Sequence, residues 1–388
     1  MADRILTTHV GSLPRPHDLL DMMKARLGGL PYDRAAYEDK VRDAVSEAVG
    51  KQVECGIDIV ADGEQSKPGF FTYVRERLKG FEPRPGMKVP FYEAEVSAFP
   101  EYYKDYFARA MGGGAVAPMH PMVCVGPVSY AGKDALERDL ANLKAALRGR
   151  EVAAAFMPSI APSGAGLNEY YRSDEEYFHA VGGALREEYK AIVDAGFLLQ
   201  IDDPFLTDLY SDRRWDAAQR ERKAALFVEA LNRALQDIPE EKVRFHTCYG
   251  INEGPRIFDS KLTDVVGHML KVKAGFYSFE GANPRHEHEY HVWESVRLAP
   301  GKALVPGVIT HGSNIVEHPE VIAERLVRYA RIVGRENVLA SADCGFSSQA
   351  CYKTEVHPKV IWEKFKALTE GARLATTKLW APAGVSMT

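Results

Sequence analysis

Three residues that favour soft metal ions stand at the ends of two apolar runs in this sequence. His246 and Cys248 lie in "VRFHTCYG", residues 243–250, and Cys344 lies in "VLASADCGFSS", residues 338–348. On a strand, residues two positions apart point to the same face, so His246 and Cys248 could hold one ion. Zn²⁺ prefers imidazole nitrogen and thiolate sulfur in tetrahedral sites. The pattern therefore predicts a zinc site, with Cys344 supplied by a later strand.

A fourth protein ligand would close such a site. Glu280 ends the apolar run 274–281, which lies between the other two runs in sequence, so it is the natural candidate. A His-x-Cys pair by itself is common by chance. The alternative is a core histidine with satisfied hydrogen bonds beside two inert buried cysteines.

A second cluster of metal-ligating residue types occurs in "NPRHEHEYH", residues 283–291. His286 and His288 would share a face in an extended segment, whereas Glu287 and His291 would share one in a helix. So many polar residues in one short stretch are more typical of the exposed start of a helix. We therefore expect the metal at the first cluster and not here.

Short apolar runs alternate along the chain with longer amphipathic stretches. The runs span residues 4–12, 56–64, 122–130, 153–163, 196–204, 243–250, 274–281, 303–312 and 337–345. Helical spacing of apolar residues marks the stretches 33–56, 173–196, 215–237 and 319–334. Strands alternating with helices predict an α/β fold with parallel βαβ units, and specifically a (β/α)8 TIM barrel.

The barrel requires eight strands, and nine runs are present. We expect the surplus run to be the first or one of the last two. A doubly wound open sheet is the rival architecture, but no G-x-G-x-x-G motif follows the first run.

Most of the apolar runs give way to polar, ionisable residues at their ends. In a barrel, every strand ends at one rim, and that rim carries the active site. The residues concerned are Ser12, Glu64, Asp202, Asp203, His246, Cys248, Glu280, His311, Asp343 and Cys344. The plainer interpretation is that polar residues only mark where strands meet solvent, but turn chemistry does not favour cysteine.

The overall composition excludes several classes of function. The 388 residues carry a net charge of −5, which gives no reason to expect a nucleic-acid partner. No apolar run is long enough to span a membrane, and the first residues do not resemble a secretory signal. Five scattered cysteines fit a reducing cytoplasm. We expect Cys55 and Cys124 in the core and Cys351 in a loop, outside the metal site.

The expected organisation is one catalytic domain over residues 1–388. The Tyr-rich and Gly-rich stretch 99–120 is interpreted as a loop excursion that could cover the site. The composition leaves open whether the chain forms a homo-oligomer.

At these residues the sequence resembles the cobalamin-independent methionine synthase family, in its C-terminal catalytic half. The resemblance runs nearly end to end and rests on "THVGSLPRP", "DIVADGEQSK", "LLQIDDPFL", "HTCYG" and "ADCG". It implies a (β/α)8 barrel with zinc bound by His246, Cys248, Glu280 and Cys344. It also implies that Ser12, Glu64 and Asp202 hold the amino acid head of homocysteine, and that His311, in "GVITHGSN", is a general acid with Asp202 as a further catalytic residue.

The chemistry of the ligand set agrees with such a role. A free thiol is little ionised at neutral pH, and binding to Zn²⁺ deprotonates it. The resemblance thus implies a transferase that activates a thiol as a zinc thiolate and forms a thioether such as methionine. The methyl donor stays open, because "GPVSYAGKDA" has Tyr130 and Lys133 and lacks the tryptophan that follows this strand in the family. Folate, a corrinoid or another electrophile would each fit.

Three other functions are weighed against this one. The related epoxyalkane:coenzyme M transferases open an epoxide with a zinc-bound thiolate, and Arg15, Lys67 or Arg285 could bind the sulfonate of coenzyme M. A decarboxylase on a uroporphyrinogen-type barrel would not need the zinc ligands. A non-catalytic protein with structural zinc usually has Cys-x-x-Cys turns, which are absent from this sequence.

Overall fold

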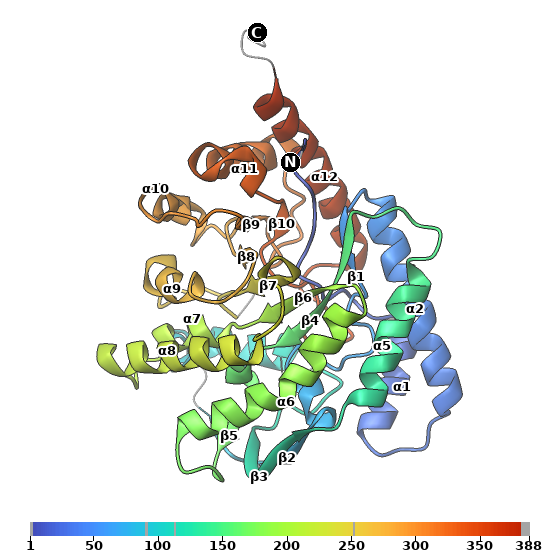
Figure 1. Ribbon diagram of the computed structural model, residues 1–388. Helices are drawn as coiled ribbons and strands as arrows, with labels where there is room; N and C mark the ends of the chain where they lie inside the picture. Colours follow the sequence, from blue (N-terminus) through green and yellow to red (C-terminus); the bar gives the residue numbers. More distant parts are fainter. Residues whose placement is uncertain (1–2, 90–91, 112–113, 251–252, 382–388) are drawn as a thin grey trace.

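The computed structural model describes residues 3–89, 92–111, 114–250 and 253–381, and its centre is a curled parallel sheet (Figure 1). The strand order is β1-β4-β6-β7-β8-β9-β10. The strands are β1 Ile59–Ala61, β4 Ala154–Ile160, β6 Leu198–Asp202, β7 Val243–His246, β8 Phe276–Phe279, β9 Ala303–Ile309 and β10 Ser341–Ala342. Nearly all their residues are buried, as expected for strands covered on both faces.

The first apolar run closes this sheet into a barrel. Thr7 forms a parallel bridge with Ala340, and the Ala340 amide donates to the Leu6 carbonyl at 2.9 Å. On its other side, the Thr7 carbonyl accepts from the Ile59 amide at 3.0 Å. Residues 6–8 therefore act as the eighth strand between β10 and β1, and the predicted (β/α)8 barrel is confirmed.

The surplus apolar run is 122–130, so the expectation that it would be the first or one of the last two was wrong. This run forms β3, Met122–Tyr130, in a separate three-stranded sheet. It pairs antiparallel with β2, Leu78–Pro83, and parallel with β5, Leu167–Asn168. Most of β3 is only partly buried, which suits a sheet with one solvated face better than a barrel strand.

Helices surround the barrel (Figure 1). They are α1 His17–Leu27, α2 Arg34–Glu54, α5 Lys133–Ala146, α6 Asp174–Asp194, α7 Phe205–Ser211, α8 Ala217–Ala234, α9 Leu262–Met269, α10 Val292–Ser295, α11 Pro319–Val333 and α12 Pro358–Trp380. The four predicted amphipathic stretches correspond to α2, α6, α8 and α11. Asp33, Ser173 and Asp216 fix three of their starts, because each side chain accepts a backbone N–H of the first turn. Within the described ranges, no helix has both the length and the apolar composition that crossing a membrane requires.

The predicted excursion is helical where it was expected to be a loop. It contains α4 Pro100–Tyr106 and the π-helical turn Phe107–Met111, and α3 Glu93–Ala98 directly precedes it, while 112–113 lie outside the described residues. Tyr103 and Tyr106 form their own small buried cluster, which gives these short helices a core. The Tyr102 hydroxyl donates to the Glu253 carbonyl at 2.7 Å, so the excursion contacts the loop after β7.

Candidate active site

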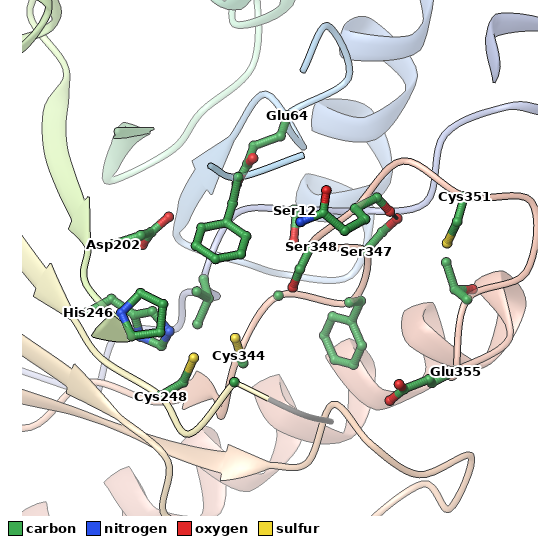
Figure 2. A pocket seen from close by; sticks show the side chains of 18 of the residues that line it. Ser12, Glu64, Asp202, His246, Cys248, Cys344, Ser347, Ser348, Cys351 and Glu355 are labelled. Carbon is green, nitrogen blue, oxygen red and sulfur yellow. Dashed lines mark hydrogen bonds between the residues drawn. The ribbon is translucent and has the colours of Figure 1, made fainter. Parts of the chain in front are cut away.

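The two apolar runs that end in soft-metal ligands lie on the same rim of the barrel. His246 is the last residue of β7, and Cys248 lies two residues after it. Cys344 lies two residues after the end of β10. One ligand atom from each lies within 4.8 Å of those of the other two, and all three residues are buried. Figure 2 shows the three side chains pointing toward one another.

The imidazole of His246 is prepared to act as a ligand. Its Nδ1 lies 3.0 Å from the Ser278 hydroxyl, which fixes the ring, while the buried Nε2 has no hydrogen-bond partner. Burial, reinforced by the positive charge of Arg244, lowers the pKa of His246 to about 3. The ring is therefore neutral, and with Ser278 as acceptor its Nε2 presents a lone pair. A buried nitrogen with this orientation fits a metal ion.

The two thiols face each other without forming a disulfide. A hydrogen bond between them, together with burial, raises the pKa of Cys344 well above its usual range. A cation placed between them would reverse this effect, because a coordinated thiol is deprotonated. The donor set of one imidazole and two thiols is the kind that Zn²⁺ prefers.

Glu280 lies beside this trio but has other partners. One carboxylate oxygen accepts from the Tyr249 amide and the other from the Asn283 side chain, both at 2.9 Å. Its ligand oxygen groups with His311 and Asp343, again within 4.8 Å. The structure thus brings three of the four predicted ligands together and sets Glu280 in an adjoining cluster.

Asp343 is a buried carboxylate that was noted only as a strand end. Its Oδ1 accepts the amides of Gly281 and Ala282, both at 2.8 Å, and its Oδ2 is buried without a partner. Burial and the nearby Glu280 carboxylate raise the pKa of Asp343 to about 8. Its place directly before Cys344 was the signal that could have marked it.

One cavity contains both the trio and the residues predicted to bind substrate. Its wall includes Ser12, Glu64, Asp202, His246, Cys248 and Cys344. Cys351 and Glu355 line its other end, away from the trio (Figure 2). Tyr106 of the excursion also contributes to the wall. His311 is buried, is not among the residues that line the cavity, and lies with Glu280 and Asp343 in the adjoining cluster.

Glu64 and Asp202 place two buried carboxyl groups in the wall of this cavity. Glu64 has a φ of 55°, a left-handed conformation that is unusual for a residue with a side chain. Its Oε2 is buried without a hydrogen-bond partner. Asp202 accepts from Gln200 at 2.9 Å, and burial together with the charge of Glu64 raises the pKa of Asp202 well above its usual range. A cationic group bound here would relieve both effects.

The cations considered for a sulfonate have other roles. The guanidinium of Arg15 donates to the carbonyls of Leu13, Ser347, Glu64 and Lys67, so it ties three loops of the rim together. The ammonium of Lys67 donates to the Pro158 carbonyl at 2.6 Å. The side chain of Arg285 is exposed. None of these three cations lines the cavity.

The His-rich stretch 283–291 is only partly exposed, which corrects the expectation of an exposed helix start. His286 is 3% exposed, whereas His288 and His291 face solvent. A 3₁₀ helix spans Glu287–His291. The three-ligand groups formed by the described part of the chain include none of these residues. Cys55 and Cys124 are buried in the core as predicted, and Cys351 stays outside the trio.

Comparisons with known proteins agree with this architecture. The sequence profile of the family described as cobalamin-independent synthase, catalytic domain, matches residues 5–110 and 166–361. Methionine synthase from Saccharolobus solfataricus is 23% identical over 375 residues, covering 96% of this chain and 95% of the relative. The enzyme of that name from Sulfolobus acidocaldarius is 23% identical over 351 residues, covering 89% and 87%.

A solved structure has the same fold. A B12-independent methionine synthase from a Shewanella species, in complex with selenomethionine, superimposes with a TM-score of 0.74 at 22% identity. The alignment covers 98% of this chain and 100% of that chain.

Proposed function

Because this chain belongs to the cobalamin-independent methionine synthase family, we propose that it transfers a methyl group to the sulfur of homocysteine and forms methionine. One observation carries the proposal: the soft ligands His246, Cys248 and Cys344 share a cavity with the carboxylates of Glu64 and Asp202. A thiol that also bears an ammonium group fits both halves of that cavity. The relatives named above extend over the same length of chain, which also supports it.

The resident metal in this proposal is Zn²⁺. His246, Cys248 and Cys344 would hold it, with the neighbouring Glu280 as the fourth ligand. The unpartnered Nε2 of His246 and the two facing thiols support this assignment. The ion would supply Lewis acidity that lowers the pKa of the substrate thiol, so that the sulfur reacts as a thiolate.

The chain's own side chains select the thiol. Glu64 and Asp202 would accept hydrogen bonds from the substrate ammonium, and the Ser12 hydroxyl, in the same cavity, would donate to its carboxylate. Charge-assisted hydrogen bonds of this kind are the strong ones. The same two carboxylates would repel a thiol whose only charge is negative, which disfavours coenzyme M and leaves the epoxide reaction without a supporting contact.

A leaving group that departs as a basic nitrogen, such as that of tetrahydrofolate, requires a proton, and His311 would provide it. As the sulfur–carbon bond forms, the bond from the methyl carbon to the donor breaks, and its electron pair stays with the donor. The pKa of His311 is lowered, and burial of the ring is the main cause. An imidazolium held there would therefore release its proton readily. Asp202, which lines the cavity and has a raised pKa, is the second group able to hold a proton there.

The decisive test is a thiol screen on the zinc-loaded protein. Calorimetry would compare homocysteine with 2-mercaptoethanesulfonate and glutathione, and mass spectrometry would detect methionine after addition of methyltetrahydrofolate or methylcobalamin. We expect binding of homocysteine and methionine with one of the donors. Preference for the sulfonate would overturn the proposal. In the protein with Co²⁺ in place of Zn²⁺, an absorption spectrum that does not change on addition of any of the thiols would favour a structural ion.

A further inference from the structure

Two of the segments that carry candidate metal ligands are joined by a hydrogen bond from a backbone amide to a side-chain carboxylate. Tyr249 follows Cys248, and its amide donates to the carboxylate of Glu280 at 2.9 Å. The other oxygen of Glu280 accepts from Asn283. The position of Tyr249 thus sets where the Cys248 loop and the Glu280 carboxylate stand relative to each other.

Tyr249 is itself held by His286. The two rings stack with their centroids 3.5 Å apart and their planes at 4°. The Tyr249 hydroxyl donates to Glu289 at 3.0 Å, and Nδ1 of His286 lies 2.9 Å from the same oxygen. Tyr249 therefore contacts His286 directly by ring stacking and indirectly through the carboxylate of Glu289, which binds both side chains.

His286 uses both ring nitrogens within the protein. Its Nε2 lies 3.2 Å from Asp259, which also accepts from Arg256. The side chains of Asp259, Glu289 and Arg256 are all at least 94% buried. A ring with an acceptor carboxylate at each nitrogen is an imidazolium, so the cluster contains two cations and two carboxylates. Nothing is left on this ring to bind a ligand or a metal.

We propose that His286 is a positioning residue for the metal site. As an imidazolium between Asp259 and Glu289, it fixes the ring of Tyr249, and Tyr249 in turn sets the spacing between the Cys248 loop and Glu280. His286 is not among the residues that line the cavity, so it would act through Tyr249. This inference rests on the proposed metal site and adds the residues, His286 and Tyr249, that set the positions of its ligands. Neighbours that orient ligands in this way commonly change metal affinity when mutated.

The test compares metal binding in three variants, using the cobalt-loaded protein as a spectroscopic reporter. His286→Gln removes the charge and one of the two donors, and we expect about tenfold or greater loss of metal affinity in chelator competition. The thiolate-to-cobalt band should remain, because both cysteines are intact, while the d–d bands should shift as Glu280 is released. A general loss of stability would not shift these bands selectively.

The matched control is His288→Gln, which makes the same change two residues away at an exposed position. It should bind cobalt with the affinity and spectrum of the unmodified protein. If His286→Gln does not fold, Tyr249→Phe decides, because it keeps the stacked ring and removes only the hydroxyl contact to Glu289. We expect for it a smaller loss of affinity, about two- to fivefold, and the same direction of band shift.

Unchanged affinity and d–d bands in a folded His286→Gln, or in Tyr249→Phe if the former does not fold, would overturn the proposal. The outcome is separable from that of the proposed function. Failure of the unmodified protein to bind zinc or cobalt would remove the metal site itself. Metal binding without methyl transfer to homocysteine would remove the reaction and leave the role of His286 to be judged by the variants.

Discussion

His246 and His286 are both buried histidines beside acidic or thiol groups, yet their surroundings differ in one decisive respect. His246 has one nitrogen hydrogen-bonded to Ser278 and the other without a partner. His286 has a carboxylate at each nitrogen. Burial holds the pKa of His246 at about 3, whereas at His286 the Asp259 and Glu289 carboxylates outweigh burial and raise it to about 9.

The difference separates a ligand from a structural cation. A buried polar atom without a partner costs about 1–3 kcal/mol, so a protein retains one where a ligand completes it. A satisfied imidazolium has no such vacancy and acts through the groups it holds. Two clusters that both contain metal-ligating residue types in the sequence thus take different roles, and their contacts give the physical reason.

The largest effect should come from removing a ligand of the trio His246, Cys248 and Cys344. We expect Cys344→Ser to weaken zinc binding by on the order of 100-fold or more. Mutation of a residue that only hydrogen-bonds to a metal ligand already lowers metal affinity about 10- to 100-fold. Methyl transfer should disappear with the metal, while the circular dichroism spectrum of the barrel persists. Metal analysis after dialysis would measure the loss. Global unfolding of this variant would indicate a structural ion instead.

A change at His311 should reduce turnover without removing metal. His311→Gln keeps a side chain of similar reach but cannot transfer a proton, so we expect kcat to fall about 100-fold or more. Zinc content and the dissociation constant of homocysteine should stay close to those of the unmodified protein. Retained kcat in a variant with full metal occupancy would exclude His311 as the acid.

The carboxylates of the cavity should affect one class of thiol selectively. Removing a charged hydrogen bond costs about 1.5–3 kcal/mol, so Asp202→Asn and Glu64→Gln should each weaken homocysteine binding roughly 10- to 100-fold. Binding of 3-mercaptopropionate, which lacks the amine, should not weaken and could improve as repulsion is relieved. Calorimetry with the two thiols gives the ratio directly. An equal loss for both thiols would mean that these carboxylates do not recognise an ammonium group.

Much of the barrel and of the trio was accessible from the sequence because the signals are local. The apolar runs and their polar ends predict strands that meet at one rim, and His246, Cys248 and Cys344 follow from that geometry. The family suggested by the short motifs is confirmed by the profile match over most of the chain. The helices predicted from spacing begin at capping residues that the sequence displays, such as Ser173 and Asp216.

The remaining features depend on partners far away in the chain. The run 122–130 is apolar enough for a barrel strand, but its neighbour β2 is the polar segment "LKGFEP", which gave no signal of a second sheet. His286 was expected near solvent. The carboxylate that binds its Nε2 belongs to Asp259, which lies 27 residues earlier, so the local sequence gave no sign of this contact. Glu280 follows its strand as predicted, yet its oxygens are taken by Tyr249 and Asn283, and spacing alone cannot specify that choice.

The smallest effect concerns stability and tests the charge of His286. Burial lowers the pKa of this group, but Asp259 and Glu289 raise it to about 9 in the folded protein, against about 6.5 in the unfolded chain. Proton binding therefore stabilises the fold fully below about pH 6.5, and this contribution is lost as the pH rises through 9. Between pH 7 and pH 8 the loss is about 1 kcal/mol. Arg256 and Tyr249, which lie beside the ring and its carboxylates, both have raised pKa values and keep their protonation over this interval.

Urea denaturation of the metal-free protein at the two pH values would measure this loss. The decrease in unfolding free energy should be about 1 kcal/mol larger for the unmodified protein than for His286→Gln, which has no proton to lose. His288→Gln should follow the unmodified protein, because its ring is exposed. Equal pH dependence in all three proteins would mean that His286 is neutral, and the contrast with His246 would then lie in hydrogen bonding alone and not in charge.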